Sequence, residues 1–205
     1  MSIKTILFDA DGVVINAEMF SLKYQKEFGV SNDKMLPFFT GVFKDCLVGK
    51  NDLKKVIKPY LKDWQWQGSA NELLTYWFKA EHQVDKNIIK LISKLRTRGI
   101  KCYLVMNQEK YRTAYIKKEM GLRKVFDKIY VSCQIGYKKP HINFYKFVYQ
   151  DLIKSDKLKK SEILYFDDLN EAVKTAKTFG IHSYLYTGFR QLHETVKKSI
   201  SSELK

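Results

Sequence analysis

The sequence predicts an α/β fold: a doubly wound, mostly parallel sheet with an all-helical cap. Apolar, strand-like runs alternate regularly with helical patterns after residue 85, and one such run also starts the chain. Between residues 16 and 85 only helical patterns occur. Alternation of this kind predicts a parallel sheet with helices on both faces. We therefore expect a core domain made of residues 1–15 and 86–205, and a cap domain made of residues 16–85.

The first strand is expected at residues 3–8, and it leads directly into Asp9-Ala10-Asp11-Gly12. In the cap, apolar positions at helical spacing predict helices at 17–28, 34–45 and 52–61. Ser69 and Glu72 have the spacing of a capping box that opens a fourth helix. The aromatic residues here are expected to form the core of the cap, and one or two can face a substrate pocket: Trp64, Trp66, Tyr76, Trp77 and Phe78.

The rest of the chain alternates in a regular order. A helix with apolar residues from 88 to 95 ends at Gly99, and Gly121 ends a helix that starts near residue 109. Another helix follows Pro140, one more runs to residue 179, and a last one closes the chain. The intervening strands are expected at 101–106, 128–131, 163–166 and 183–186.

The composition is that of a globular chain of 205 residues, 45% of them hydrophobic. No apolar run approaches the roughly 18 residues needed to cross a bilayer, and the first residues lack the pattern of a secretory signal. We therefore expect a cytoplasmic protein without a membrane partner. Three widely spaced cysteines fit neither a disulfide framework nor a zinc site, and are expected to be buried thiols.

A net charge of +15 raises the possibility of a nucleic-acid partner. The lysines, however, are spread along the helices opposite the apolar positions, and only five of the 37 basic residues are arginine, which is preferred for bidentate contacts to phosphates and bases. We expect no specific nucleic-acid binding. Salt-sensitive retention of DNA or RNA would test that alternative.

Polar residues follow four of the predicted strands. Asp9 and Asp11 follow the first, Asn107 follows the next, Lys138 and Lys139 come after the third, and Asp167 and Asp168 follow the fourth. Ligands of such sheets bind at the carboxyl ends of the strands, so these groups are expected to converge. Any one carboxylate there can simply cap a helix, but four together would repel one another. A divalent cation would relieve that repulsion, and its site is expected to be oxygen-rich.

These residues resemble the motifs of the haloacid dehalogenase superfamily of hydrolases, in the branch with a helical cap inserted after the first motif. Asp9-Ala10-Asp11-Gly12-Val13-Val14 is similar to the first motif and residues 104–108 to the second. Gly136-Tyr137-Lys138-Lys139-Pro140 is similar to the third and residues 165–168 to the fourth. The resemblance covers the whole chain and implies a Rossmann-like core.

The resemblance implies a Mg²⁺-dependent phosphatase. Asp9 would attack phosphorus and form an aspartyl-phosphate, and Asp11 would protonate the leaving oxygen and later deprotonate water. Asp9, a backbone carbonyl of Asp11 and Asp168, with Asp167 close by, would hold the metal. Lys139, which directly precedes proline as in the family pattern, would neutralise the anions, and Asn107 would contact the substrate.

Two positions depart from the family pattern. Met106 stands where the family usually has serine or threonine, and a thioether cannot donate a hydrogen bond to a phosphoryl oxygen. Ala172 replaces an asparagine often found after the fourth motif. An alternative function is therefore that of a catalytically impaired relative that binds a phosphorylated ligand or a partner protein as a regulator.

Asp11, the second aspartate of the first motif, favours phosphoryl transfer over halide displacement, because the dehalogenases of the superfamily generally lack this residue. A phosphomutase stays possible. A cap of this size predicts a small phosphorylated substrate, for example a sugar phosphate, phosphoglycolate or a nucleotide. The oligomeric state is not predicted by the sequence.

Overall fold

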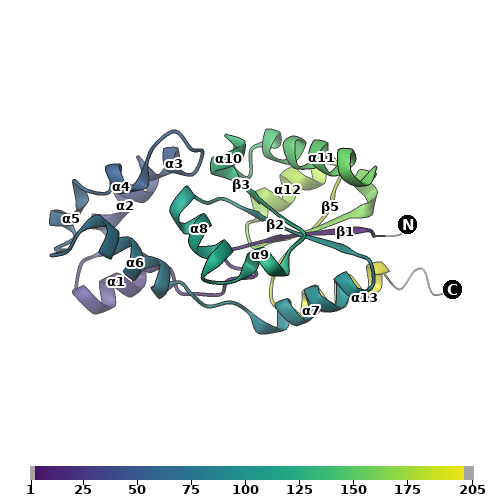
Figure 1. The fold of residues 1–205 in the computed structure, drawn as a ribbon, viewed down its shortest axis with the longest axis horizontal. Helices are drawn as coiled ribbons and strands as arrows, with labels where there is room; N and C mark the ends of the chain where they lie inside the picture. Colours follow the sequence, from purple (N-terminus) through teal and green to yellow (C-terminus); the bar gives the residue numbers. More distant parts are fainter. Residues whose placement is uncertain (1–2, 201–205) are drawn as a thin grey trace.

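The computed structural model describes residues 3–200, and five parallel strands form its single sheet in the order β3-β2-β1-β4-β5. The first strand of the chain is thus the central one, with neighbours on both sides (Figure 1). This arrangement confirms the predicted parallel sheet. The strands are β1 (Thr5–Asp9), β2 (Lys101–Met106), β3 (Lys128–Val131), β4 (Ile163–Asp167) and β5 (His182–Leu185).

Helices cover both faces of the sheet. In Figure 1, α11 and α12 lie above the strands, and α7 and α13 lie below them. These helices follow the strands at the positions that the sequence predicts. The core helices are α7 (Lys86–Thr97), α8 (Lys110–Lys118), α9 (Leu122–Val125), α10 (Ser132–Ile135), α11 (Ile142–Asp156), α12 (Asn170–Phe179) and α13 (Phe189–Ile200), with a 3-10 turn at Lys160–Glu162.

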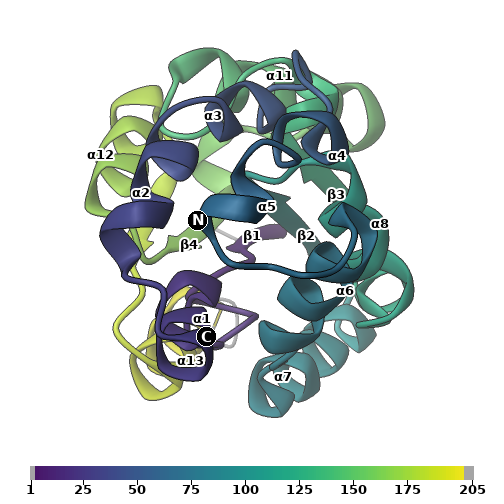
Figure 2. The ribbon, with the colours of Figure 1, turned by 90° about the vertical axis from the view of Figure 1, so that its left-hand side faces the viewer.

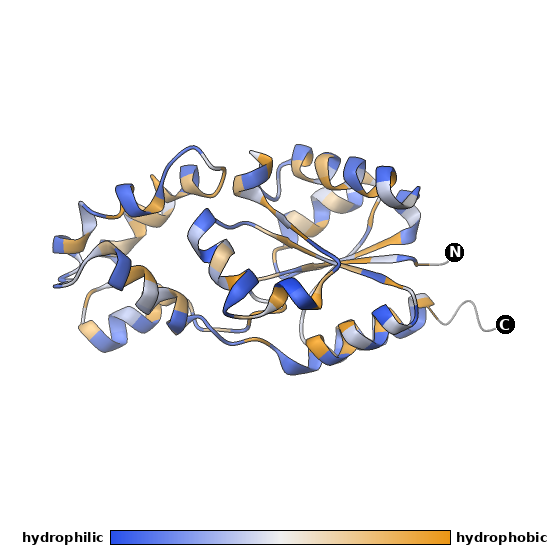
Figure 3. Cartoon of the chain, in the orientation of Figure 1, coloured by the Kyte–Doolittle hydropathy of each residue, from blue (hydrophilic) through white to orange (hydrophobic). Residues whose placement is uncertain are grey.

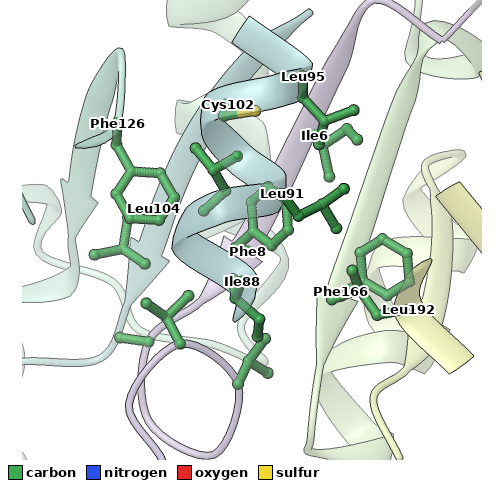
Figure 4. Close-up of a cluster of buried hydrophobic side chains, with 14 of the residues drawn as sticks. Ile6, Phe8, Ile88, Leu91, Leu95, Cys102, Leu104, Phe126, Phe166 and Leu192 are labelled. Carbon is green, nitrogen blue, oxygen red and sulfur yellow. The ribbon is translucent and has the colours of Figure 1, made fainter. Parts of the chain in front are cut away.

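The central strand is buried on both faces because its side chains alternate between two hydrophobic clusters. Ile6 and Phe8 pack on the side of α7 and α13, whereas Leu7 packs on the side of α11. Figure 4 shows the first cluster, in which Ile88, Leu91 and Leu95 of α7 meet Phe8 and the neighbouring strands. Burying each such side chain contributes about 1.5–3 kcal/mol, so this layer fixes the sheet beneath the site.

The cap is the helical segment between β1 and α7, and it has a hydrophobic cluster of its own. Phe20 stacks on Trp77 with ring centroids 4.9 Å apart, and Trp64 packs edge-on against Phe38. Figure 3 shows hydrophobic residues in these helices as well as in the strands. The cap helices are α1 (Phe20–Phe28), α2 (Asn32–Thr40), α3 (Phe43–Cys46), α4 (Leu53–Val56), α5 (Tyr60–Asp63) and α6 (Ala70–Ala80).

Two predicted cap helices are each split in the structure. The helix expected at 34–45 ends at Gly41 and resumes as α3, and the helix expected at 52–61 is interrupted before Pro59. Pro59 has no backbone N–H to donate to the preceding turn, which favours a break there, although Pro37 is accommodated inside α2. The predicted capping box of α6 is confirmed, because Ser69 N–H donates to Glu72 Oε2 at 2.7 Å and Glu72 N–H donates to Ser69 Oγ.

The cap sits over the carboxyl ends of the strands, on two connecting segments that run side by side. Asn16 N–H donates to the Gln83 carbonyl, and Asp85 N–H donates to the Val14 carbonyl, both at 2.9 Å. Figure 2, viewed from the cap end, shows the cap helices in front of β1, β2 and β4. The backbone pairing therefore fixes where the chain leaves and re-enters the core.

The cysteine prediction holds for two of the three residues. Cys46 and Cys102 are buried, Cys133 is half-buried, and all three are free thiols. Between residues 3 and 200, no helix combines the length and the apolar character that crossing a bilayer requires.

Candidate active site

Three carboxylates and one lysine meet where β1 and β4 end. Lys139 Nζ lies 2.6 Å from Asp9 Oδ1 and 2.7 Å from Asp167 Oδ2, and Asp168 is the next residue along the chain. Lys139 and Asp167 are almost fully buried, at 2% and 0% exposure. The structure thus brings together residues that lie up to 159 positions apart, from Asp9 to Asp168, as strand-end convergence predicts.

The three carboxylates can hold a divalent cation. One oxygen from each of Asp9, Asp167 and Asp168 lies within 4.8 Å of the others. Hard carboxylate oxygens are the ligands that Mg²⁺ prefers. Gly12 makes room for them, since a Cβ built at this position would lie 2.1 Å from Asp168 Oδ2, and its φ of +81° also favours glycine. The donor set and the space beside it fit Mg²⁺.

The electrostatics of this cluster also favour a bound cation. Burial raises the pKa of Asp9 well above its ordinary value, and the Asp167 carboxylate raises it further against the pull of Lys139. Burial likewise raises the pKa of Asp168. Although burial alone would lower the pKa of Lys139, Asp9 and Asp167 hold it above the usual range. One ammonium group is therefore shared among crowded carboxylates, and a cation would stabilise their ionised forms.

The carboxylates of Asp167 and Asp168 differ in how many hydrogen bonds they accept from the protein. Asp167 accepts hydrogen bonds from Lys139, from the Tyr165 hydroxyl and from Leu169 N–H at 2.8 Å. These donors keep the pKa of Asp167 below its ordinary value despite its burial. Asp168 is exposed toward the cavity described below. Asp168 is thus the freer ligand, and Asp167 holds Lys139 in place.

Asp11 is held by a bidentate contact with a buried arginine. Arg112 Nη1 donates to Asp11 Oδ2 at 2.8 Å, and Nη2 donates to Oδ1 at 2.7 Å. Gln108 Nε2 donates to Oδ2 as well, at 2.6 Å. Although burial alone would raise it, Arg112 holds the pKa of Asp11 below its ordinary value. Both carboxylate oxygens of Asp11 are therefore engaged by the core.

Arg112 also reaches the cap. Its Nη2 lies 3.0 Å from Glu81 Oε2, and the other oxygen of Glu81 accepts from Phe20 N–H at 2.8 Å. Glu109 positions the arginine by capping α8, because it accepts from Tyr111 N–H at 2.7 Å and from Arg112 N–H. The expected site residues include neither Arg112 nor Glu81. Arg112 lies in the first turn of α8, the helix that follows the second motif, and this position is the sequence feature that places it near the site.

The side chains of Asn107 and Met106 make contacts within the protein that the sequence analysis does not predict. Asn107 accepts from Lys139 N–H at 2.8 Å and donates to the Lys139 carbonyl at 2.9 Å, so its side chain holds the loop that carries the lysine. It also lines the cavity. Met106 is fully buried in the hydrophobic cluster below the sheet. It shares this cluster with Leu104 and is not among the residues that line the cavity.

A cavity of about 590 Å³ lies between these residues and the cap. Its core side is formed by Asp9, Asp11, Lys139 and Asp168, so the polar groups converge on one wall. Phe20 and Trp77 of the cap contribute to the opposite wall. A pocket of this size, with a few converging polar groups, is typical of a small-molecule site.

The fold of this chain occurs in solved structures. A haloacid dehalogenase family enzyme from Bacteroides thetaiotaomicron superposes with a TM-score of 0.80 at 21% identity, over 95% of this chain and 99% of that one. A predicted hydrolase of the same superfamily from Porphyromonas gingivalis gives 0.76 at 21% identity, over 96% and 99%. The L-2-haloacid dehalogenase of Xanthobacter autotrophicus gives 0.64 at 15% identity, over 97% and 84%.

The sequence profile of the haloacid dehalogenase-like hydrolases matches residues 6–186, a range that includes both connecting segments, the cap and all four motifs. Together with the parallel sheet and the converging aspartates, this match places the chain in the haloacid dehalogenase-like hydrolase family.

Proposed function

We propose that this protein is a Mg²⁺-dependent phosphatase that hydrolyses a small phosphorylated metabolite through an aspartyl-phosphate on Asp9. The observation that carries the proposal is the cluster of Asp9, Asp167 and Asp168 around the buried Lys139, at the carboxyl ends of the central strands. It combines a nucleophile, a cation site and a fixed positive charge beside one cavity.

Asp9 has one carboxylate oxygen available for attack. Lys139 Nζ and Ala10 N–H both contact Oδ1, at 2.6 Å each, and among residues 3–200 no further partner engages Oδ2. Attack by Oδ2 would form the bond to phosphorus while the bond from phosphorus to the substrate oxygen breaks. Water would then attack the phosphorus, release inorganic phosphate and regenerate the Asp9 carboxylate.

Asp11 is the acid and base of this scheme. Its side chain would give a proton to the leaving oxygen in the first step and take one from water in the second. Because Arg112 holds the pKa of Asp11 low, Asp11 must first take up a proton from solvent to act as the acid, which requires that its contact with Arg112 loosens as substrate binds. The presence of this second acid supports phosphoryl transfer over halide displacement, which needs no leaving-group acid.

Asp9, Asp168 and the backbone carbonyl of Asp11 would hold Mg²⁺, with Asp167 beside them. When bound, Mg²⁺ supplies charge neutralisation between the carboxylates and the phosphoryl group. The Bacteroides enzyme has been solved in complex with magnesium and inorganic phosphate, which supports this assignment. Lys139 would add a second positive charge at the same place.

A second candidate function is that of a catalytically impaired relative that binds a phosphorylated ligand or a partner and acts as a regulator. Two observations favour it: both oxygens of Asp11 are engaged, and Met106 offers no hydrogen-bond donor to a phosphoryl group. Such a protein would bind Mg²⁺ and inorganic phosphate but would not turn over.

Hydrolysis of a generic aryl phosphate separates the two functions. The phosphatase should release phosphate in the presence of Mg²⁺, and both chelation of the metal and Asp9→Asn should abolish this release. Lys138→Met is a control at the neighbouring lysine. Within residues 3–200, the Lys138 side chain forms no ion pair. Activity that survives Asp9→Asn would exclude the phosphatase mechanism, and binding without turnover in the wild type would favour the regulator.

A further inference from the structure

The two walls of the cavity differ in chemistry. The core wall carries the aspartates and Lys139, whereas the cap wall is mainly apolar, with Ser21, Asn32 and Glu81 as its polar residues. The phosphoryl group belongs at the core wall, so the remainder of a substrate must lie against the cap. The apolar side chains that line this wall are Phe20, Leu36, Phe39, Phe43, Leu47 and Trp77.

The cap wall offers no positive charge. The cap is rich in lysine, yet none of its lysines lines the cavity, although the chain as a whole has a net charge of +15. The one charged cap residue at the wall is Glu81, a carboxylate. A second anionic group on a substrate would therefore meet apolar surface and a negative charge, which is unfavourable without a partner.

The two core cations are already paired with carboxylates. Lys139 contacts Asp9 and Asp167, at 2.6 and 2.7 Å. Arg112 contacts Asp11 at 2.7 Å and Glu81 at 3.0 Å. Lys139 lies at the place of the phosphoryl group, and Arg112 would have to give up a carboxylate to bind a second anion. The cavity thus provides for one anionic group.

Apolar side chains are also exposed where the cavity opens. Met19 and Leu36 of the cap are 62% and 46% exposed, and Leu169 of the core, next to Asp168, is 54% exposed. They come from both sides of the cavity and all three line it. Exposed apolar surface gathered at a binding site is typical of a surface that a ligand covers.

We propose that the substrate is a phosphomonoester whose only anionic group is the phosphoryl group and whose alcohol part is uncharged and mainly apolar. This inference rests on the proposed phosphatase function and narrows its substrate class. It disfavours phosphoglycolate, nucleotides with several phosphates and polyhydroxylated sugar phosphates. The apolar part packs against Phe39, Phe43 and Leu36 while Asp9 faces the phosphorus.

Alkyl phosphates test the preference, because their leaving groups differ little in reactivity. We expect kcat/KM for hexyl phosphate to exceed that for ethyl phosphate, phosphoglycolate and glucose 6-phosphate by about tenfold or more, since even one methylene that enters an apolar pocket is worth about tenfold. Equal or higher kcat/KM with phosphoglycolate or glucose 6-phosphate would overturn the inference.

A cation placed on the cap wall should change the preference. Leu36→Lys is expected to lower the ratio of kcat/KM for hexyl phosphate over phosphoglycolate by about tenfold, because one pocket contact can discriminate by this amount. Leu22→Lys is the matched control, since Leu22 is an exposed leucine of the cap that does not line the cavity. An unchanged ratio in Leu36→Lys, or equal changes in both variants, would contradict the assignment of this wall.

Binding separates this inference from the phosphatase proposal. If the Mg²⁺-loaded protein hydrolyses neither an aryl phosphate nor any of these esters, the phosphatase proposal fails, but the cavity still predicts tighter binding of hexylphosphonate than of phosphonoacetate. Titration calorimetry measures both. Tighter binding of phosphonoacetate, equal binding, or binding of neither compound overturns the inference whether or not the protein is a phosphatase.

Discussion

Arg112 donates from both of its terminal nitrogens to the two carboxylate oxygens of Asp11, at 2.8 and 2.7 Å, across 101 positions of sequence. The same guanidinium contacts Glu81, the last cap residue beside the cavity. The proposed acid of the reaction is therefore held by a residue that also holds the cap. Glu81 of the cap and Asp11 of the core are thus linked through one side chain.

Arg112→Met should lower kcat by about a hundredfold, the usual contribution of a positioned acid or base. It should also destabilise the fold by about 3 kcal/mol, because the largely buried Glu81 loses its charged partner. Steady-state kinetics and urea unfolding measure the two effects. Arg190→Met, at an ion pair on the surface, should change neither. A kcat equal to that of the wild type would show that Asp11 does not depend on Arg112.

Gly12→Ala should weaken Mg²⁺ binding, because a Cβ at this position would lie 2.1 Å from Asp168 Oδ2 and displace that carboxylate. Disturbing the residues around a metal ligand typically costs about ten- to a hundredfold in affinity. Calorimetry with Mg²⁺ measures the change. Gly121→Ala provides the control: its φ of +72° imposes similar backbone strain, but no atom lies within 4 Å of its Cβ. The metal assignment would be wrong if both variants bound Mg²⁺ like the wild type.

Asp52 should make the docking of the cap sensitive to acid. It accepts from Lys110 Nζ at 2.6 Å and from the Tyr111 hydroxyl, and the hydrogen bond from Lys110 is the main reason that its pKa is lowered to about 2. A carboxyl with a depressed pKa in the folded state stabilises the fold above its unfolded pKa, near 3.8, and loses this contribution as the pH falls toward 2.

Asp52→Asn removes the charge but keeps a side chain that caps α4 well. Urea unfolding between pH 6 and pH 2 should show the wild type more stable than the variant at pH 6, by less than about 1 kcal/mol for a pair at the surface. The difference should shrink as the pH falls from about 4 toward 2. A difference that stays constant over this range would contradict the role of the Asp52 carboxylate.

The strand-end residues could be predicted because their positions follow from local patterns. Asp9, Asn107 and Asp167 each come directly after or at the end of an apolar run, and the carboxyl ends of parallel strands meet at one edge. The register of β1 with both β2 and β4 then places them side by side. The core fold could be predicted for the same reason.

Contacts between the cap and the core could not be predicted in this way. Arg112 and Glu81 carry no local signal of their pairing, since a charged residue on a helix is usually solvated. Pro59 is a local signal for the second break in the cap helices, whereas the first break, at Gly41, follows a helix whose Phe38 packs against the distant Trp64. The apolar cap wall also depends on orientation, because the sequence alone does not distinguish a core aromatic from one that lines a cavity.

The central claim is that Asp9 becomes phosphorylated during turnover, and acid quenching of the Mg²⁺-loaded protein with an aryl phosphate tests it most directly. We predict that peptide mass spectrometry of the quenched protein finds a phosphoryl group on Asp9, and that Asp9→Asn carries none. Turnover of the ester without any phosphorylated Asp9, or with the phosphoryl group on another residue, would contradict the account.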